Sequence, residues 1–91
     1  MKRKTVRVLN PLGFHARAAA RFVAEASRFT SQITVVFGDK EMDGKSILGL
    51  LLLAVPFGAT IQVKAEGRDE KEAVKALGAV VSGLFGEAPK R

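Results

Sequence analysis

The chain contains no cysteine, and this absence restricts how a protein of 91 residues can be stabilised. Disulfide bonds, zinc–thiolate sites and thiol catalysis are all excluded, and a chain without cysteine suits a reducing cytosol. A domain of this length buries only about 60–65% of the surface that its unfolded chain exposes. An apolar core must therefore provide the stability, and 47% of the residues are hydrophobic. We expect a single domain over residues 1–91, located in the cytoplasm.

Alternating apolar and polar residues predict β-strands in three segments of the chain. The segments cover residues 4–9, 33–37 and 61–66. Gly38-Asp39 predicts a tight turn from the second segment into a short strand at residues 40–43. Because a tight hairpin joins antiparallel strands, these four strands favour an antiparallel sheet.

Apolar residues recur at three- and four-residue steps between these strands, which is typical of amphipathic helices. The first helix is predicted over residues 16–29, and the second over residues 47–54 with Ser46 as its N-cap. A third helix follows Asp69, which matches a capping box with Glu72. The resulting order βαββαβα predicts an α+β domain in which a four-stranded antiparallel sheet carries its three helices on one face.

The formal net charge of +6 comes from the N-terminal third of the chain. Residues 1–30 contain seven basic residues and one acidic residue, whereas residues 31–91 contain eight of each. The one histidine also lies in the basic third, so the distribution favours an anionic ligand or an acidic partner surface. The cluster Lys2-Arg3-Lys4 fits a disordered tip at residues 1–3, an ion-pairing strand end or a site for an additional ligand, and we favour the disordered tip. Residues 87–91 form a tail that could also be disordered.

The stretch Gly13-Phe14-His15-Ala16-Arg17 places His15 at the predicted start of the first helix. The first N–H groups of a helix have no intrahelical partner, and the helix dipole makes this end a binding site for anions. The same field disfavours an imidazolium ion and leaves a ring nitrogen available as a nucleophile. The guanidinium of Arg17 suits phosphate oxygens. These features fit reversible phosphorylation of His15, although the spacing alone also fits a histidine that only caps the helix.

Other functional classes find little support in the sequence. There is no second histidine, no metal-ligand spacing and no glycine-rich phosphate loop, so we expect no metal, no cofactor and no enzymatic activity. Tyrosine and tryptophan are absent and no recognition-helix pattern occurs, which argues against a nucleic-acid partner. The apolar run at residues 47–57 contains Pro56 and is shorter than the roughly 20 residues that span a membrane, so we expect no membrane insertion.

Three motifs, in the same register as the predicted elements, resemble one known family. They are Gly13-Phe14-His15-Ala16-Arg17, Gly44-Lys45-Ser46-Ile47-Leu48-Gly49 and Ala65-Glu66-Gly67-Arg68-Asp69-Glu70. They resemble the active-site signature, the middle-helix serine segment and the last strand-to-helix joint of HPr, the histidine phosphocarrier of the bacterial phosphoenolpyruvate-dependent phosphotransferase system. The resemblance covers about residues 4–86 and implies an open-faced β-sandwich.

The resemblance also implies roles for individual residues. His15 would accept a phosphoryl group on Nδ1 from enzyme I and pass it to enzyme IIA in sugar uptake, while Arg17 and the backbone N–H of Ala16 would stabilise the group. The carrier would dock with several partners in turn. Nothing in the sequence demands more than a monomer, and we expect one. The candidate docking residues are Ile47, Leu48, Leu51, Leu52, Arg21 and Lys45. For the four apolar residues, packing in the core is the alternative.

Ser46 and Ala18 are two further positions at which the family pattern bears on the interpretation. Ser46 fits a structural N-cap, and the resemblance adds a regulatory interpretation, in which an HPr kinase/phosphorylase phosphorylates it. The family usually has proline where this chain has Ala18, and we expect this difference to affect transfer kinetics more than the fold.

Four other functions remain alternatives to the sugar-uptake carrier. The nitrogen-related branch of the same relay shares the histidine motif and differs in its partners. A regulator that has lost phosphotransfer fits less well, because His15 and Arg17 are both present. A small basic nucleic-acid-binding module and a purely structural interaction domain are the alternatives from other classes.

Overall fold

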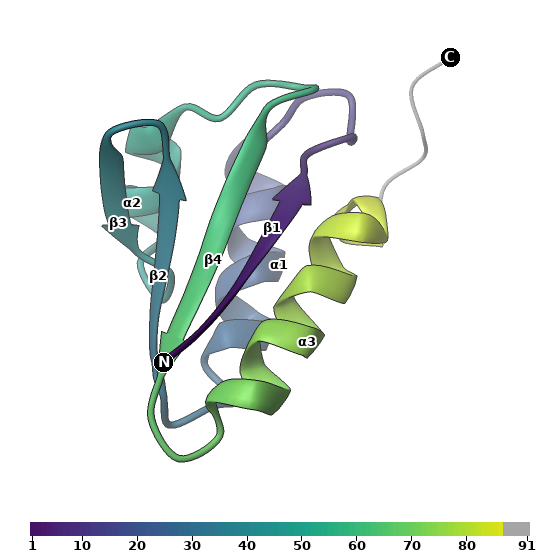
Figure 1. Ribbon diagram of the computed structural model, residues 1–91. Helices are drawn as coiled ribbons and strands as arrows, with labels where there is room; N and C mark the ends of the chain where they lie inside the picture. Colours follow the sequence, from purple (N-terminus) through teal and green to yellow (C-terminus); the bar gives the residue numbers. More distant parts are fainter. Residues whose placement is uncertain (87–91) are drawn as a thin grey trace.

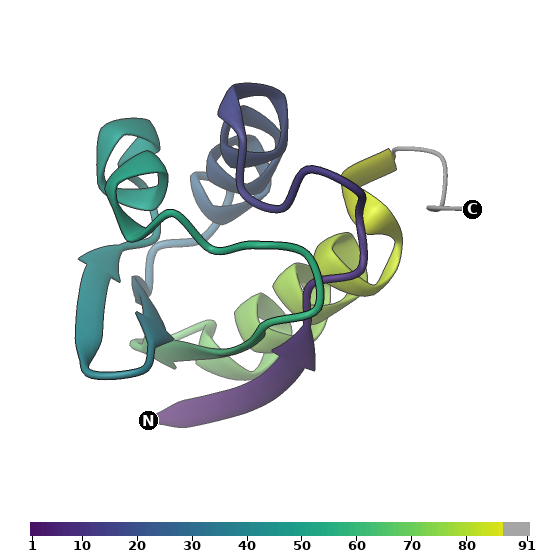
Figure 2. The ribbon, with the colours of Figure 1, turned by 90° about the horizontal axis from the view of Figure 1, so that it is seen from above.

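The computed structural model describes residues 1–86 and has the predicted order of strands and helices (Figure 1). The elements are β1 (Lys2–Arg7), α1 (Ala16–Ala26), β2 (Gln32–Phe37), β3 (Lys40–Asp43), α2 (Ile47–Leu53), β4 (Thr60–Glu66), α3 (Glu70–Ser82) and a short 3₁₀ turn (Leu84–Gly86). The predicted fold class is confirmed, since all four strands form one antiparallel sheet and the three helices cover one of its faces (Figure 2).

The sheet has the strand order β1-β4-β2-β3, so the two strands at its centre are not neighbours in sequence. The register places Val6 opposite Ile61 and Val35 opposite Val63, all of which are buried. Alternation along each strand therefore points one set of side chains towards the helices and the other set away from them. The predicted hairpin is confirmed, because Phe37 pairs with Lys40 across Gly38-Asp39.

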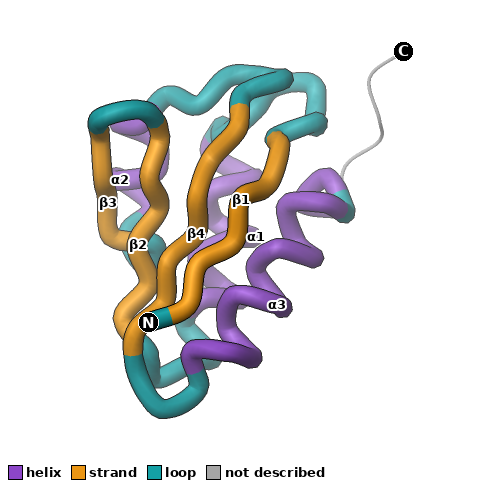
Figure 3. The backbone as a smooth tube through the Cα atoms, viewed as in Figure 1, coloured by secondary structure: helices purple, strands orange, loops and turns teal. Residues whose placement is uncertain are grey.

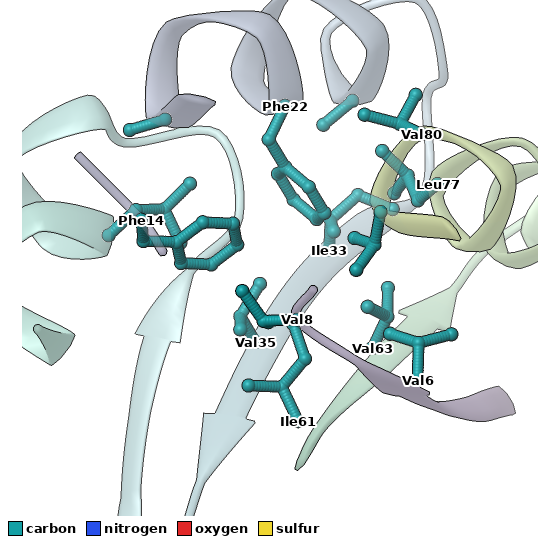
Figure 4. Close-up of a cluster of buried hydrophobic side chains, with 14 of the residues drawn as sticks. Val6, Val8, Phe14, Phe22, Ile33, Val35, Ile61, Val63, Leu77 and Val80 are labelled. Atoms are coloured by element: carbon teal, nitrogen blue, oxygen red, sulfur yellow. The ribbon is translucent and has the colours of Figure 1, made fainter. Parts of the chain in front are cut away.

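The core lies between the sheet and the helices (Figure 4). Phe22 of α1 and Leu77 of α3 are fully buried above the inward-facing valine and isoleucine side chains of the strands. Phe14 packs edge-to-face against Phe22 and against Phe85, with ring centroids 5.7 Å and 5.2 Å apart. Phe14 thereby anchors the segment before α1 to the body of the protein.

The start of the chain differs from the disordered tip that we expected at residues 1–3. Lys2 and Arg3 belong to β1 and pair with Ala65 and Lys64 of β4. The amino group of Met1 forms an ion pair with Glu70, at 3.1 Å. Strand pairing and this ion pair hold the segment in place, which is closest to the second alternative, an ion-pairing strand end. The expectation for residues 87–91 lies outside the described residues.

The first helix is shorter than the predicted range of residues 16–29. It ends at Ala26, and residues 27–29 continue as a hydrogen-bonded turn in which Ser27 donates to the carbonyl of Val23 and Phe29 to that of Ala26. Within residues 1–86 no helix combines the length and apolarity that crossing a membrane requires.

The capping box predicted at the start of α3 is wrong. Asp69 occupies the N-cap position, but its carboxylate accepts hydrogen bonds from the backbone of Thr30 and Ser31 and from the Ser31 hydroxyl. These bonds, that of the Ser31 hydroxyl first, lower the pKa of Asp69 to about 2. Glu70, not Glu72, reaches back to accept a bond from the N–H of Gly67. Asp69 therefore joins the loop before β2 to the loop before α3 and leaves the helix start uncapped by its side chain.

Candidate functional site

The turn between β1 and α1 presents His15 at one end of the molecule. Gly13 adopts a φ of +64°, and a Cβ atom there would lie 2.1 Å from the carbonyl oxygen of Val55. Only glycine fits this position. The next residue, Phe14, donates its N–H to the same Val55 carbonyl at 3.0 Å, so the loop after α2 runs beside the turn (Figure 3). The backbone before His15 is thus held against a second loop.

His15 is the N-cap residue of α1, as predicted. Its backbone is extended, and its carbonyl accepts the first helical hydrogen bond, from Ala19 at 2.9 Å. Its half-buried imidazole accepts no hydrogen bond from the first turn of the helix. The capping role that the spacing also allowed is therefore not the one observed. The N–H groups of Ala16, Arg17 and Ala18 have no acceptor within the helix, which leaves three donors at its positive end.

The basic side chains of α1 differ in their surroundings. Arg17 lies exposed on the first turn, next to His15 in sequence. Arg21 contacts Glu25 at 3.3 Å, and Glu25 also binds Arg28 at 2.7 Å. Ala18, where the family usually has proline, is fully buried. Arg17 is therefore the arginine of α1 that is best placed to meet an anion at His15.

The distribution of charge along the sequence suggested one positive patch around His15. The structure shows instead that the basic residues of the N-terminal third lie apart. Lys2 and Lys4 lie at the start of β1, whereas the turn that leads to His15 follows the opposite end of this strand (Figure 1). The stem of Lys4 lies across α3 at Gly78, where an added Cβ would come within 2.6 Å of the Lys4 Cδ atom. Lys4 thus belongs to the β1–α3 surface.

The candidate docking residues on α2 divide into three exposed residues and one that packs inside. Ile47, Leu48 and Leu52 are exposed, the last two by 67% and 61%. Leu51 is half-buried and packs against the core. Helices α1 and α2 lie side by side on the same face of the sheet (Figure 2). The exposed leucine and isoleucine side chains therefore belong to a helix that neighbours α1 on the same face of the sheet.

Sequence reasoning missed two further apolar side chains at this end of the molecule. Leu12 is 71% exposed in the turn before His15, and Phe57 is exposed in the loop that follows α2. The hydrogen bond from Phe14 to Val55 brings these two loops together. The sequence could have indicated Leu12, because a large apolar residue between Pro11 and Gly13 in a turn is expected to be exposed and has no local structural role.

Ser46 and Lys45 both make contacts within the fold. The Ser46 hydroxyl accepts a hydrogen bond from the N–H of Gly49 at 3.0 Å, which confirms its prediction as the N-cap of α2. The ammonium group of Lys45 donates to the carbonyl oxygen of Phe29 at 2.7 Å, in the turn that follows α1. Since α1 has 11 residues and is about 16 Å long, Lys45 is bound near the end of the helix remote from His15.

A metal site has no evident ligands in the part of the chain that the structure describes. Among residues 1–86, no three histidine, aspartate or glutamate side chains lie close enough together to hold a metal ion. The functional groups at the His15 end are one imidazole, one guanidinium, three backbone N–H groups and the exposed side chains of Leu12 and Phe57.

Comparison with known proteins agrees with this geometry. The family model described as the phosphorylation site of the HPr component of the phosphotransferase system matches residues 2–82. The phosphocarrier protein HPr of Neisseria meningitidis serogroup A is 41% identical over 96% of this chain and 98% of its own length. The phosphocarrier protein NPr of Shewanella violacea is also 41% identical, over 93% of each chain.

Solved structures give the same result. The crystal structure of HPr from Thermoanaerobacter tengcongensis is 45% identical, has a TM-score of 0.93, and matches over 97% of this chain and 99% of its own. An HPr dimer from the same organism is 46% identical, with a TM-score of 0.76 over 96% of this chain and all of the other. Likeness to these proteins therefore does not by itself imply the monomer that we expected. It does establish the family: this chain is a member of the HPr phosphocarriers of the phosphotransferase system.

Proposed function

We propose that this protein carries phosphoryl groups on His15, from phosphorylated enzyme I to an enzyme IIA that acts in sugar uptake. The observation that carries the proposal is the start of α1. There the imidazole leaves the helix uncapped, and three N–H groups and Arg17 remain for an anion. The relay that we propose works in the cytoplasm with a monomeric carrier.

The transfer step needs a nucleophile and donors for the moving phosphoryl group. The lone pair of Nδ1 of His15 attacks the phosphorus atom, and the bond from phosphorus to the donor group of enzyme I breaks as the new P–N bond forms. Charge on the three equatorial oxygens is stabilised by the N–H groups at the start of α1 and by Arg17. The second transfer repeats this exchange, with His15 as the leaving group.

Docking must bring a partner's reactive group within reach of His15. The exposed side chains of Leu12 and Phe57 supply apolar area at the His15 end of the molecule, and those of Leu48 and Leu52 supply more along α2. Arg17 supplies positive charge beside it, which favours a partner surface that is apolar at its centre and acidic near the phosphoryl group. Lys45 contributes less to this surface than we expected from the sequence, because its ammonium group is bound to Phe29.

Incubation with phosphoenolpyruvate and enzyme I tests the proposal. We expect a phosphate on His15 that is labile in acid and stable in base, and none on His15→Ala. Equal phosphorylation of the variant would overturn the proposal. Subsequent incubation with a sugar-type and a nitrogen-type enzyme IIA separates the two branches, and we expect faster transfer to the sugar-type domain.

Regulatory phosphorylation of Ser46 is a second proposal. The hydroxyl is half-buried and caps α2, so a kinase must displace the bond from Gly49 before it can reach the oxygen atom. A phosphate would then place about two negative charges beside the exposed α2 side chains and weaken contact with an acidic partner. An unchanged mass at this residue after incubation with an HPr kinase/phosphorylase and ATP would contradict it.

A further inference from the structure

We infer that Asn10 is a positioning residue for phosphoryl transfer at His15, an inference that rests on the proposed function. Asn10 is one of two polar residues that are completely or almost completely buried among residues 1–86, and it lies in the turn between β1 and α1. Burial of an amide group lowers the stability of the fold unless hydrogen bonds within the protein replace those with water. The hydrogen bonds of Asn10 indicate its structural purpose.

The side chain and the main chain of Asn10 both bind Gly13. The carbonyl oxygen of Asn10 accepts a hydrogen bond from the N–H of Gly13 at 3.1 Å, which closes the turn. The side-chain amide nitrogen of Asn10 donates to the carbonyl oxygen of Gly13 at 2.6 Å. The same Gly13 oxygen accepts the N–H of His15 at 3.0 Å. One carbonyl group thus connects the Asn10 amide to the backbone of His15.

The peptide unit between Gly13 and Phe14 is held from both sides. Its oxygen receives Asn10 and His15, and its N–H binds the carbonyl of Val55. The bonds from His15 and to Val55 are made by main-chain atoms, which a substitution leaves in place. Asn10 therefore supplies a side-chain hydrogen bond that orients this peptide, and with it the direction in which the chain enters α1.

This geometry matters for a transfer reaction more than for binding. The Nδ1 atom must lie in line with the phosphorus atom while the helix N–H groups face the phosphoryl oxygens. A displacement of about 1 Å at such a site can slow a reaction by about 10²-fold. Loss of one of the bonds that hold the turn should produce a smaller displacement, and we expect transfer to slow by about tenfold.

Two substitutions separate the hydrogen bond from the space that Asn10 fills. Asn10→Asp keeps the shape and replaces the donor by a second oxygen that faces the Gly13 carbonyl. Asn10→Ala removes the donor together with the rest of the amide and serves if the aspartate variant does not fold. Val63→Ala is the matched control, because it removes buried atoms from the centre of β4 and lies outside the turn.

The experiment measures two properties of each folded variant. The first is the NMR spectrum of the His15 imidazole in the unphosphorylated protein, which requires no partner. The second is the rate of phosphorylation by enzyme I at limiting and at saturating carrier concentration. We expect both Asn10 variants to shift or broaden the imidazole signals and to lower the saturated rate by about tenfold, with a smaller change in the half-saturating concentration. Val63→Ala should leave both near the wild-type values.

The outcomes distinguish this inference from the proposed function. Imidazole signals that match the wild type, or a saturated rate within twofold of Val63→Ala, would overturn the positioning role of Asn10. If the wild-type protein accepts no phosphate on His15, the proposed function fails, and the role of Asn10 in transfer fails with it. The imidazole spectra then show only whether Asn10 orients the ring.

Discussion

Helices α1 and α2 both begin after a residue with an extended backbone but differ in how their first N–H groups are satisfied. At α2 the Ser46 hydroxyl accepts the N–H of Gly49, so the serine closes its own helix start. At α1 the residue in the same position is His15, whose side chain makes no such bond. A stable N-cap and a nucleophile are therefore alternative uses of one position, and this protein has one helix of each kind.

The largest expected effect is on phosphorylation, when His15 is replaced by a serine N-cap like that of α2. Both His15→Ser and His15→Ala should abolish acid-labile phosphorylation by enzyme I, because neither side chain has an imidazole. The serine variant should also be more stable than the alanine variant by about 1 kcal/mol, the usual contribution of a serine N-cap. Urea unfolding measures the difference in the free energy of unfolding.

Equal stability of these two variants would mean that the start of α1 cannot accept a cap. The contrast with α2 would then come from backbone geometry and not from the choice of side chain. Serine phosphorylation that is stable in acid would instead show that the site accepts any nucleophile at this position.

The second largest effect is expected from Arg17, the cation beside the uncapped start of α1. Arg17→Ala should lower the rate of phosphorylation of His15 by about 10²-fold, the usual loss when one donor to a developing charge is removed. Arg28→Ala removes the same charge from the turn that follows α1, where Arg28 pairs with Glu25, and should leave the rate within twofold. Comparable losses in both variants would indicate that these arginines act only through the total positive charge of the protein.

The third effect is on the pH dependence of stability, and it involves the N-cap residue of α3. The Asp69 carboxylate also stands at an N-cap but binds Thr30 and Ser31. Its pKa falls from 3.8 to about 2, so the folded state is stabilised when this group is ionised. The stabilisation should be complete above about pH 4 and should be lost as the pH falls from there towards 2.

Asp69→Asn should remove much of this pH dependence and lower the stability at neutral pH. Urea unfolding between pH 2 and pH 6 measures how steeply the free energy of unfolding changes with pH. Some dependence should remain, because the N–H of Gly67 and the amino group of Met1 lower the pKa of Glu70 as well. An unchanged slope in the variant would show that the bonds to the loop before β2 do not persist in solution.

The three helix starts also show which features could be predicted from the sequence. Ser46 was identifiable because its bond to Gly49 lies within four residues. The pattern at Asp69 and Glu72 also suggested a local cap, but the acceptor is used by Ser31, 38 residues away. A local pattern predicts where a helix begins, whereas the partner of its first polar side chain depends on which loops the fold brings together.

The same reason explains the errors at the surface. A run of charged residues at the start of a chain suggests a solvated tip, and Lys2 and Arg3 belong to such a run. Their strand partners are residues of β4, about 60 positions away in the sequence. The exposed side chains of Leu12 and Phe57 share one end of the molecule because Phe14 binds Val55. The alternation of apolar residues predicted the sheet and its covered face, and no alternation encodes these contacts between loops.

The smallest expected effect is on the capped helix itself. Ser46→Ala should destabilise the protein by about 1 kcal/mol, because the N–H of Gly49 loses its acceptor at the start of a helix of seven residues. The rate of phosphorylation of His15 should stay within twofold of the wild type, since the reacting groups all belong to α1 and the turn before it. Urea unfolding and the enzyme I assay measure the two quantities on the same samples. A rate that falls together with the stability would show that the start of α2 also helps to form the phosphoryl site, and the division between a capped and a reactive helix would no longer hold.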